Sequence, residues 1–293
     1  MPELPEVSGL QAFLGTHLRG ATLERIQITS FAVLKTADPP YTELQGHHVE
    51  DVRRHGKFLD LDFGGLHFIF HLAKAGWLRY TDKPSAAPLR PGSGPIAARL
   101  AFDLPSAGDG PAAAGFDLTE AGSKKSLAIY VVRDPREVPG IASLGPDPLS
   151  AGFTRDVFDH ILAASQQIKG LLRSQQVVAG IGNAYSDEIL HAAKISPFAI
   201  AKTLDDSSRD RLYAAIGEVL SEAVAAAAGK PPEQLKDSKR NTMRVHGRAG
   251  QPCPVCGDTI REVSFADTAL QYCPGCQTQG KILADRRTSR FLK

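Results

Sequence analysis

The sequence predicts an α+β protein with a sheet-rich first half, a helical second half and a small metal-binding hairpin near its C-terminus. Strand-like segments follow one amphipathic helix over roughly the first 150 residues, which favours a β-sandwich or flattened barrel. Helical periodicity replaces them after a connector at residues 144–149 that holds two prolines and a glycine. Two Cys-x-x-Cys pairs then occur near the end of the chain.

Composition indicates an ordinary soluble protein of roughly two domains, with 293 residues, 42% of them apolar and 23% charged. No run of about 18 apolar residues and no signal-peptide pattern occur, so we expect an intracellular, cytoplasmic protein without a membrane partner. The net charge of +2 is unevenly placed, because residues 236–293 carry 11 Lys/Arg against 5 Asp/Glu. This basic end suits a nucleic-acid partner, and a solvated basic tail is the alternative.

The first helix is predicted at residues 5–19, where Val7, Leu10, Leu14 and Leu18 share one face. Gly64-Gly65 between two apolar runs predicts a tight β-hairpin. Residues 83–95 and 105–115 read as surface loops. The expected strands are residues 22–29, 49–54, 58–63, 66–72, 96–103 and 127–133.

Four cationic or imidazole side chains lie close to strand ends in this half. Lys57 opens one strand, His71 ends the next, Lys74 lies in the small-residue loop that follows, and Arg136 comes after Asp134-Pro135. Binding loops are commonly found at strand ends, although each of these side chains taken alone is typical of a solvated surface.

The second half is expected to contain helices at residues 154–164, 168–173, 185–193 and 207–228. Before the third of these, Gly180-Ile181-Gly182-Asn183 predicts a tight turn that places an amide beside a helix N-terminus. Free N–H groups at a helix N-terminus bind phosphate readily, and an ordinary helix–helix turn is the alternative.

All four cysteines of the chain belong to the two pairs Cys253/Cys256 and Cys273/Cys276, which are separated by 16 residues. This spacing is typical of one structural Zn²⁺ held by four thiolates, which stabilises a hairpin too small to form its own core. Two disulfides are the weaker alternative in an intracellular protein. We therefore predict a zinc site that positions residues 259–272.

The N-terminus, Met1-Pro2-Glu3-Leu4-Pro5-Glu6, offers unusual chemistry if Met1 is removed, which a small second residue permits. Pro2 then carries a secondary amine, and a free α-amino group titrates near ~7.7–8.0. Such an amine is a nucleophile that forms an iminium on a sugar C1′, and Glu3 and Glu6 can transfer the protons. The alternative is a disordered start followed by a proline in the first turn of a helix.

Taken together, these motifs resemble the bifunctional DNA glycosylase/AP lyases of the formamidopyrimidine-DNA glycosylase and endonuclease VIII family. The resemblance implies a two-layered β-sandwich at residues 1–143, a helix–two-turn–helix domain at 144–235 and a zinc finger at 236–293. It rests on Pro2-Glu3-Leu4-Pro5-Glu6-Val7, His55-Gly56-Lys57, His71-Leu72, Asp134-Pro135-Arg136, Leu144-Gly145-Pro146-Asp147-Pro148-Leu149, Gly180-Ile181-Gly182-Asn183 and Tyr272-Cys273-Pro274-Gly275-Cys276-Gln277.

The resemblance implies a base-excision repair enzyme, acting as a monomer in a bacterial-type nucleoid, that binds damaged double-stranded DNA and needs no redox or organic cofactor. It assigns Pro2 as the nucleophile, Glu3 as general acid/base and Glu6 as a neighbour of the nucleophile. It further implies β-elimination and δ-elimination at the resulting abasic site. The DNA contacts that it implies, mostly to the backbone, come from Lys57, His71, Lys74, Arg136 and Asn183.

The sequence departs from the family pattern at three places. Lys74 and Val138 replace the Met and Phe that in the formamidopyrimidine branch fill the gap left by a flipped base. Thr268 replaces the zinc-finger arginine, for which Arg261 or Arg287 can substitute. Residues 232–248 are expected to form a loop without the usual purine-recognition stretch. These departures favour the endonuclease VIII branch, with oxidised pyrimidines or abasic sites as substrates.

Two functions from different classes remain open. One is an active glycosylase/lyase, and the other is a non-catalytic protein that binds damaged or abasic DNA on the same scaffold. The presence of Pro2, Glu3 and Lys57 favours catalysis, because binding alone does not need an N-terminal secondary amine. A zinc-ribbon protein of translation or transcription leaves the N-terminal motif unexplained.

Overall fold

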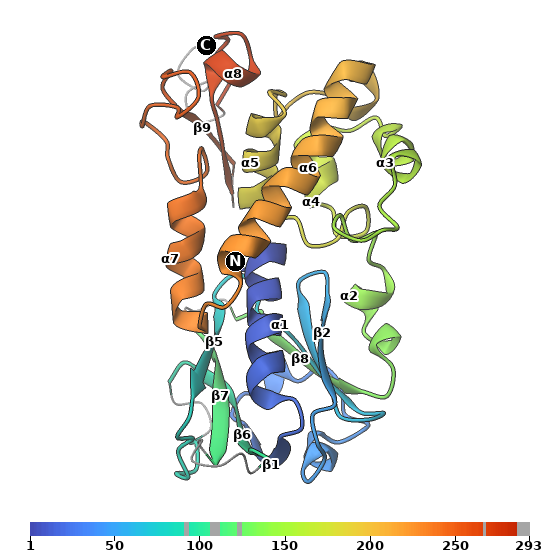
Figure 1. Ribbon diagram of the computed structural model, residues 1–293, viewed down its shortest axis with the longest axis vertical. Helices are drawn as coiled ribbons and strands as arrows, with labels where there is room; N and C mark the ends of the chain where they lie inside the picture. The colour runs from blue at the N-terminus through green and yellow to red at the C-terminus, as the bar shows by residue number, and fades with distance from the viewer. Residues whose placement is uncertain (91–93, 106–111, 122–124, 266–267, 286–293) are drawn as a thin grey trace. The chain divides into compact units, whose positions relative to one another are not determined.

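The computed structural model describes residues 1–90, 94–105, 112–121, 125–265 and 268–285 (Figure 1). The chain divides into two compact units. The first comprises Met1–Ser143 and Ala227–Lys236, and the second comprises Leu144–Ala226 and Asp237–Lys293. The division into three domains expected from the sequence stays a prediction.

The first unit contains two antiparallel four-stranded sheets, which confirms the predicted β-sandwich. One sheet has the order β1-β6-β7-β5 and the other has the order β2-β3-β4-β8. Phe70 of the second sheet lies 6.0 Å from Phe116 of the first, measured between ring centroids, so the two sheets share a core. The strands are β1 (Thr22–Ile28), β2 (Asp51–His55), β3 (Phe58–Asp62), β4 (His67–His71), β5 (Gly76–Thr81), β6 (Ile96–Asp103), β7 (Ala113–Glu120) and β8 (Ala128–Val132).

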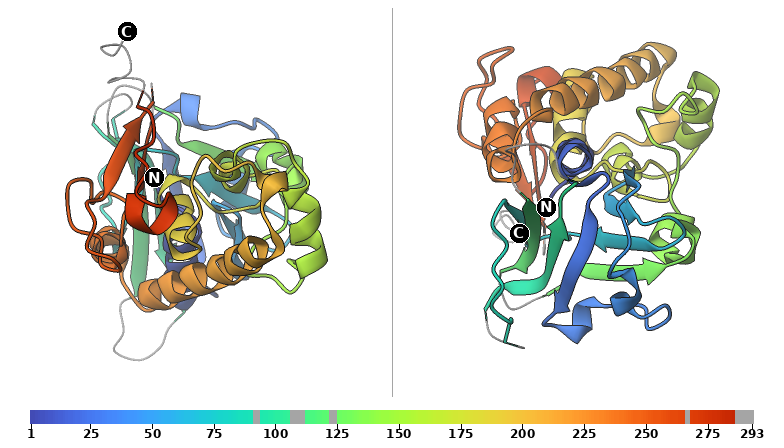
Figure 2. Two further views of the ribbon diagram at one scale, coloured as in Figure 1. Left: turned by 90° about the horizontal axis from the view of Figure 1, so that it is seen from above. Right: turned by 60° about the horizontal axis from the view of Figure 1, so that its bottom comes forward.

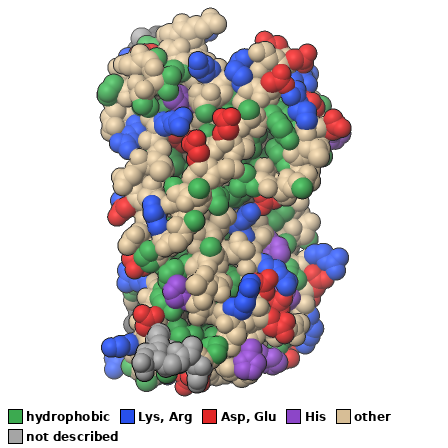
Figure 3. All heavy atoms as spheres, in the orientation of Figure 1, with side chains coloured by type: hydrophobic (Ala, Val, Ile, Leu, Met, Phe, Trp, Pro, Cys, Tyr) green, Lys and Arg blue, Asp and Glu red, His purple; other side chains and the backbone are tan. Residues whose placement is uncertain are grey.

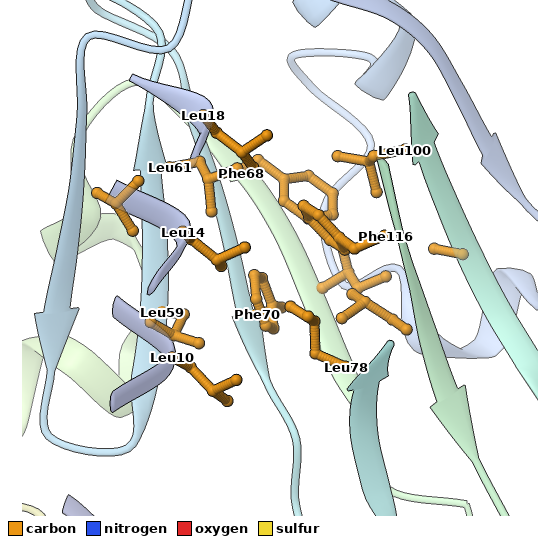
Figure 4. Close-up of a cluster of buried hydrophobic side chains, with 14 of the residues drawn as sticks. Leu10, Leu14, Leu18, Leu59, Leu61, Phe68, Phe70, Leu78, Leu100 and Phe116 are labelled. Carbon is orange, nitrogen blue, oxygen red and sulfur yellow. The ribbon is translucent and has the colours of Figure 1, made fainter. Parts of the chain in front are cut away.

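Helix α1 (Leu4–Leu18) packs along β2 and β3 of its own unit, as the views in Figure 2 also show. Its apolar face is buried against the strands, with Leu10, Leu14 and Leu18 directed into the cluster drawn in Figure 4. Each fully buried side chain of this kind contributes about 1.5–3 kcal/mol to the free energy of unfolding. The helix face expected from the sequence is therefore the one that joins the core.

Gly9 lets the segment Ala227–Lys236 approach α1 closely. A Cβ atom at Gly9 would lie 2.9 Å from Cδ2 of Leu235 and 3.1 Å from Cβ of Ala227. Leu235 and Ala227 are both buried in the main core of this unit. A larger residue at position 9 would therefore push this segment away from the sandwich.

The second unit is helical and ends in a zinc-finger hairpin formed by β9 (Arg261–Ser264) and β10 (Ala269–Tyr272). The hairpin agrees with the expected one. Helix α2 (Pro139–Ala142) belongs to the first unit, and α7 (Pro232–Thr242) begins in the first unit and ends in the second. The other helices after α1 are α3 (Arg155–Leu162), α4 (Ile168–Arg173), α5 (Asn183–Ala192), α6 (Asp206–Ala227) and α8 (Pro274–Gln277).

Strands β5 and β7 and helix α7 are the longest of the elements that were not expected from the sequence. Strands β5 and β7 pair with each other, and the sequence indicated neither. Strand β7 begins inside the loop expected at residues 105–115. Helix α7 occupies residues 232–242, so the expectation of a loop at 232–248 is wrong over most of its length. Pro231 and Pro232 stop the preceding helix, but Pro232 also starts a new one, because proline is well suited to the first turn.

None of the helices among the described residues has the length and apolar character that crossing a membrane requires. On the face drawn in Figure 3, Lys and Arg side chains of the described residues are interspersed with Asp and Glu. That face therefore carries charges of both signs in mixed groups.

Candidate active site and metal centre

The N-terminus of α1 holds Pro2 and the two predicted carboxylates in a fixed arrangement. Glu3 is the N-cap, and the Glu6 carboxylate accepts the backbone N–H of Glu3 at 2.8 Å, completing a capping box. Pro2 is buried, and the side chains of Glu3 and Glu6 are each only 3% exposed. Burial and capping therefore fix the backbone that carries Pro2, while Met1 is 48% exposed.

The packing of α1 shows which end of the sheet this terminus reaches. The Gly20 N–H donates to the Val49 carbonyl at 2.7 Å, and the Gln11 side chain donates to the Val52 carbonyl at 3.2 Å. Going back from Gln11 to Pro2 covers about 13 Å of helix, and going on from Val52 to the β2–β3 turn covers about 13 Å of strand. The N-terminus of α1 and that turn therefore lie at the same end of the first unit.

Lys57 and His71 are located at this end as well. Lys57 follows Gly56 in the two-residue turn between β2 and β3, where Gly56 has a φ of +56°, and Lys57 is 7% exposed. His71 pairs with Phe58 across β3 and β4. The structure therefore places Pro2, Glu3, Lys57 and His71, four of the residues that the sequence singled out, at one end of the first unit.

His71 is held as a neutral imidazole. Burial, together with the nearby charge of Lys57, lowers the pKa of His71 to about 4. Its Nδ1 atom accepts the backbone N–H of Ala73 at 3.3 Å, which fixes the proton of the neutral ring on Nε2. His71 thus presents a hydrogen-bond donor over the whole neutral pH range.

The loop after His71 has a constrained backbone that exposes Lys74. Ala73 adopts a φ of +51°, and the Gly76 N–H donates to the Leu72 carbonyl at 2.9 Å. A Cβ atom at Gly76 would lie 2.1 Å from the same carbonyl oxygen, so only glycine fits there. Lys74 is exposed at the tip of this loop, where it can reach a polyanion.

Arg136 lies apart from this group. Its side chain is 84% exposed, and its guanidinium binds the Asp134 carboxylate at 2.5 Å. This contact, together with the hydrogen bond from the Arg136 backbone N–H, lowers the pKa of Asp134 to about 2. Asp134 also interacts with the charge of His67, at the start of β4. His71 ends the same strand, four positions or about 13 Å further on, so Asp134 and Arg136 lie near the opposite end of β4 from His71.

Val138 is not available to fill a gap in DNA. Its side chain is fully buried and packs with Ile69 and Val132 on the sheet face of β2-β3-β4-β8 that lies away from the main core. In this conformation the side chain of Val138 therefore belongs to a small hydrophobic cluster and does not take over the gap-filling role of the Phe that it replaces.

In the second unit, Asn183 is the first residue of α5 and faces the zinc-finger hairpin. Its Nδ2 donates to the Ala269 carbonyl of β10 at 2.7 Å. Its Oδ1 is buried without a hydrogen-bond partner among the residues that the structure describes. The amide side chain therefore joins the first turn of α5 to the hairpin.

Sequence reasoning missed a buried ionic group behind Asn183. The Lys169 ammonium, 6% exposed, donates to the Asp187 carboxylate at 2.5 Å, to Ser186 Oγ at 2.8 Å and to the Asn183 carbonyl at 3.1 Å. His246 Nδ1 lies 2.8 Å from the other oxygen of Asp187. A lysine in an apolar helical run gives no sign in the sequence of a partner 18 residues away.

Glu188, the next residue of α5, holds the chain that leads into the zinc finger. Its carboxylate accepts the backbone N–H groups of Arg244, Val245 and His246 at 2.8, 3.0 and 2.8 Å. Burial raises the pKa of Glu188, and these three hydrogen bonds oppose that rise. Helix α5 is thus the element onto which the finger is built.

The four cysteines lie together and fit one tetrahedral Zn²⁺. The Sγ atoms of Cys253 and Cys276 are 3.8 Å apart, and those of Cys256 and Cys273 are 3.3 Å apart. Tetrahedral Zn–S bonds of about 2.3 Å place sulfurs about 3.8 Å apart, so a small adjustment accommodates the ion. The ion would tie both knuckles to the small core that Cys253 and Cys273 form with Val245 and Ile260.

Thr268 lies at the tip of the zinc-finger hairpin, where its carbonyl accepts the Phe265 N–H at 2.7 Å. Arg261 pairs with Tyr272 at the other end of the hairpin, four strand positions or about 13 Å from Thr268. Arg261 therefore does not take the place of an arginine at position 268 in this conformation, and Arg287 lies outside the described residues.

Comparisons with known proteins cover nearly the whole chain. The model of the formamidopyrimidine-DNA glycosylase N-terminal domain matches residues 1–116, and that of the H2TH domain of the same enzyme matches residues 144–232. A third model, the zinc finger found in FPG and IleRS, matches residues 250–279 and includes all four cysteines. These matches confirm the predicted zinc finger and its structural Zn²⁺.

Formamidopyrimidine-DNA glycosylases are among the similar proteins and solved structures. The enzyme of Symbiobacterium thermophilum is 33% identical over 300 residues, which span 98% of this chain and 93% of that protein. The Lactococcus lactis enzyme bound non-covalently to DNA containing an AP site has a TM-score of 0.79 and 26% identity, covering 94% of this chain and 99% of that one. The same enzyme in complex with DNA containing Fapy-dG has a TM-score of 0.80 and 26% identity, covering 94% and 100%.

Proposed function

Because the chain belongs to the formamidopyrimidine-DNA glycosylase family, we propose that it is a DNA repair glycosylase that removes oxidised bases and cleaves the resulting abasic site. The observation that carries this proposal is the buried and capped N-terminus of α1, which places Pro2 and Glu3 at the same end of the first unit as Lys57 and His71. A further element of the proposal is that the protein works as a monomer on double-stranded DNA in the bacterial cytoplasm.

The first chemical step requires loss of Met1, which converts the Pro2 nitrogen from an amide into a secondary amine. Once the damaged nucleotide is flipped out, this amine attacks C1′ and the C1′–base bond breaks. The base leaves with the bond electrons and takes up a proton, while the Pro2 nitrogen loses its own. Glu3 then protonates O4′ as the sugar ring opens, which leaves an iminium between Pro2 and C1′.

The iminium then drives strand cleavage. Because it withdraws electrons, a base can remove a C2′ proton, and the C3′–O3′ bond breaks with the phosphate as leaving group. A second elimination removes the C4′ proton and breaks the C5′–O5′ bond, again with phosphate as leaving group, and water finally hydrolyses the iminium to regenerate the Pro2 amine. Glu3 is the carboxylate that we place next to the reacting atoms.

Glu6 acts on this chemistry through the backbone. Its carboxylate accepts the Glu3 N–H at 2.8 Å and is therefore engaged in holding the first turn. We assign Glu6 a positioning role, because its carboxylate caps the helix and so orients Pro2 and Glu3. Its burial keeps the carboxylate in this place.

Lys57 and His71 supply complementary donors for a phosphate beside the lesion. Lys57 carries a positive charge in the turn at this end of the unit, and His71 offers a neutral Nε2–H. A cation attracts the phosphate from a distance, and a fixed neutral donor adds direction. Lys74 on the neighbouring loop and the N-terminus of α5 at Asn183 are further contacts that we propose for the DNA backbone.

A second candidate function, damage binding without cleavage, is favoured by two observations. Thr268 stands where the family has an arginine, and the Asn183 side chain is occupied by the Ala269 carbonyl.

The relatives described above and the departures of the sequence favour different lesions. The relatives favour oxidised purines of the Fapy type, whereas the sequence departures favour oxidised pyrimidines.

Borohydride trapping separates the two candidates. The protein is incubated with duplexes carrying an abasic site, Fapy-dG, 8-oxoguanine or thymine glycol, and the adduct is mapped by mass spectrometry. We expect a covalent adduct on Pro2 with at least one oxidised base and with the abasic site. Pro2→Gly should lose the adduct on oxidised bases but should still bind abasic DNA. Retention of Met1 in the intact mass, or tight binding without any adduct, would mean that the protein binds damage and does not cut it.

A further inference from the structure

A histidine lies against the zinc site although it belongs to neither Cys-x-x-Cys pair. His191, in the last turn of α5, is 2% exposed, and its Nε2 lies 3.3 Å from Sγ of Cys253. Ligand atoms of His191, Cys253, Cys273 and Cys276 all lie within 4.8 Å of one another. The site therefore offers five potential ligands to an ion that takes four.

The surroundings of the imidazole decide whether His191 binds the metal through Nε2 or donates a hydrogen bond to a metal-bound sulfur. If Nε2 bound the metal, the ring proton would be on Nδ1, which is buried and has no hydrogen-bond partner among the described residues. Nδ1 lacks a partner among them in either tautomer, but a metal-bound histidine almost always donates its other N–H to one, so the solitary Nδ1 argues against coordination through Nε2. With the proton on Nε2, the ring instead donates to a sulfur atom at hydrogen-bond distance.

We propose that His191 stays outside the zinc coordination shell and donates its Nε2–H to the Cys253 thiolate, so that all four cysteines bind the ion. An N–H donor on a thiolate withdraws charge from the sulfur, which makes it a poorer site for protonation and oxidation while the metal is bound. His191 is thus a positioning residue for zinc retention, independent of the reaction proposed for Pro2.

The hydrogen bond also connects the metal to α5. The same helix carries Asn183 at its first turn and Glu188, which accepts three N–H groups of the segment that leads into the finger. Gln277 of α8 adds a further connection, because its Nε2 donates to the Ile195 carbonyl just after α5 at 2.9 Å. Zinc bound to Cys253 therefore stabilises the position of the finger on the helical part of this unit.

The unaltered zinc-loaded protein gives the first test. Long-range ¹H–¹⁵N correlation spectra should show His191 protonated on Nε2 and unprotonated on Nδ1, and X-ray absorption should show four sulfur neighbours around zinc. A ring protonated on Nδ1, together with three sulfurs and one nitrogen in the zinc shell, would overturn the proposal and make His191 a ligand.

Substitutions give the second test, with a chelator competing for zinc. We expect His191→Phe to weaken zinc affinity roughly 10- to 100-fold, as is typical when a hydrogen-bond partner of a metal ligand is lost. His191→Gln, which keeps an N–H donor, should restore most of that affinity. The matched control His160→Phe changes an exposed histidine at the end of α3 and should have no effect.

A spectroscopic measurement separates the hydrogen bond from simple packing. In the Co²⁺-substituted protein, loss of the donor raises the energy of the sulfur lone pairs, so the sulfur-to-cobalt charge-transfer band should move to longer wavelength in His191→Phe and return in His191→Gln. Equal zinc affinity and an unshifted band in His191→Phe would contradict the proposal.

Discussion

The Glu6 carboxylate accepts the backbone N–H of Glu3 at 2.8 Å, so the side chain of one predicted catalytic carboxylate fixes the backbone of the other. This relationship makes the first turn of α1 a rigid support for Pro2, the residue just before the N-cap. It also means that the two carboxylates are not equivalent, although the sequence presents them symmetrically around Leu4 and Pro5.

Glu6→Ala should lower both the stability of the first unit and the yield of the Pro2 adduct. Loss of a capping interaction costs about 1 kcal/mol, and the released turn no longer orients the amine. Glu6→Gln keeps an acceptor and should retain most of the adduct. Denaturant unfolding and borohydride trapping check this, with Glu24→Ala at an exposed position of strand β1 as control. Unchanged trapping in Glu6→Ala would remove the positioning role.

His71→Leu should weaken binding to abasic DNA by about fivefold, the equivalent of one neutral hydrogen bond of about 1 kcal/mol. His71→Gln keeps a donor and should bind nearly as well as the unaltered protein. Because the pKa of His71 is lowered to about 4, its protonation should not strengthen binding as the pH falls from 8 to 5.5. Fluorescence anisotropy over this range is the measurement, and a rise in affinity that His71→Gln abolishes would contradict a neutral ring.

Much of the fold could be predicted from local signals in the sequence. The Gly64-Gly65 hairpin agrees with the structure, where these glycines have φ values of +74° and +100°, and the apolar stripe of α1 is the buried one. Strand β7 could not be recognised, because Ala113, Ala114 and Gly115 have weak strand propensity and become a strand only by pairing with β5 and β6.

Site residues could be predicted where the functional groups are neighbours in the sequence. They could not be predicted where a residue acts through a contact with a residue far away in the sequence. Pro2, Glu3 and the four cysteines are visible as motifs. Lys169 and His191 were missed because their partners, Asp187 and Cys253, are brought to them by the packing of α5, which no spacing in the sequence indicates.

The buried Asp60 connects two histidines and should make the stability of the first unit depend on pH. Burial tends to raise the pKa of Asp60, but hydrogen bonds from His55 and His67, each at 2.9 Å, hold it below its usual 3.8. Burial likewise tends to lower the pKa of His67, and the Asp60 hydrogen bond raises it above 6.5, with Asp62 acting in the same direction and Arg53 opposing.

The two shifts define a pH window. The contribution of Asp60 is present above its unfolded pKa near 3.8 and is lost as the pH falls through its lower folded pKa. The contribution of His67 is complete below 6.5 and is lost as the pH rises through its raised folded pKa. We therefore expect the pair to stabilise the fold most between about pH 4 and 6.5. Urea unfolding from pH 4 to 9 checks this, and His67→Gln should flatten the decline above pH 6.5. An identical decline in the variant would show that other groups cause it.

Lys169→Met should destabilise the second unit by about 3–5 kcal/mol, because it leaves the Asp187 carboxylate buried without its ammonium partner at 2.5 Å. His246 and the Gln271 N–H also contact this carboxylate, but at 2.8 and 3.3 Å, so they compensate only in part. Lys202→Met, which changes an exposed lysine, is the matched control and should be nearly neutral.

A second variant shows whether the cost comes from the stranded charge. In Lys169→Met/Asp187→Asn the buried carboxylate is replaced by a neutral amide that can still bond to the Gln271 N–H, so much of the lost stability should return. Thermal unfolding of the zinc-loaded protein measures both variants. If the double variant is less stable than Lys169→Met alone, the ammonium is needed for its hydrogen bonds to Ser186 and the Asn183 carbonyl, and charge pairing with Asp187 is the smaller effect.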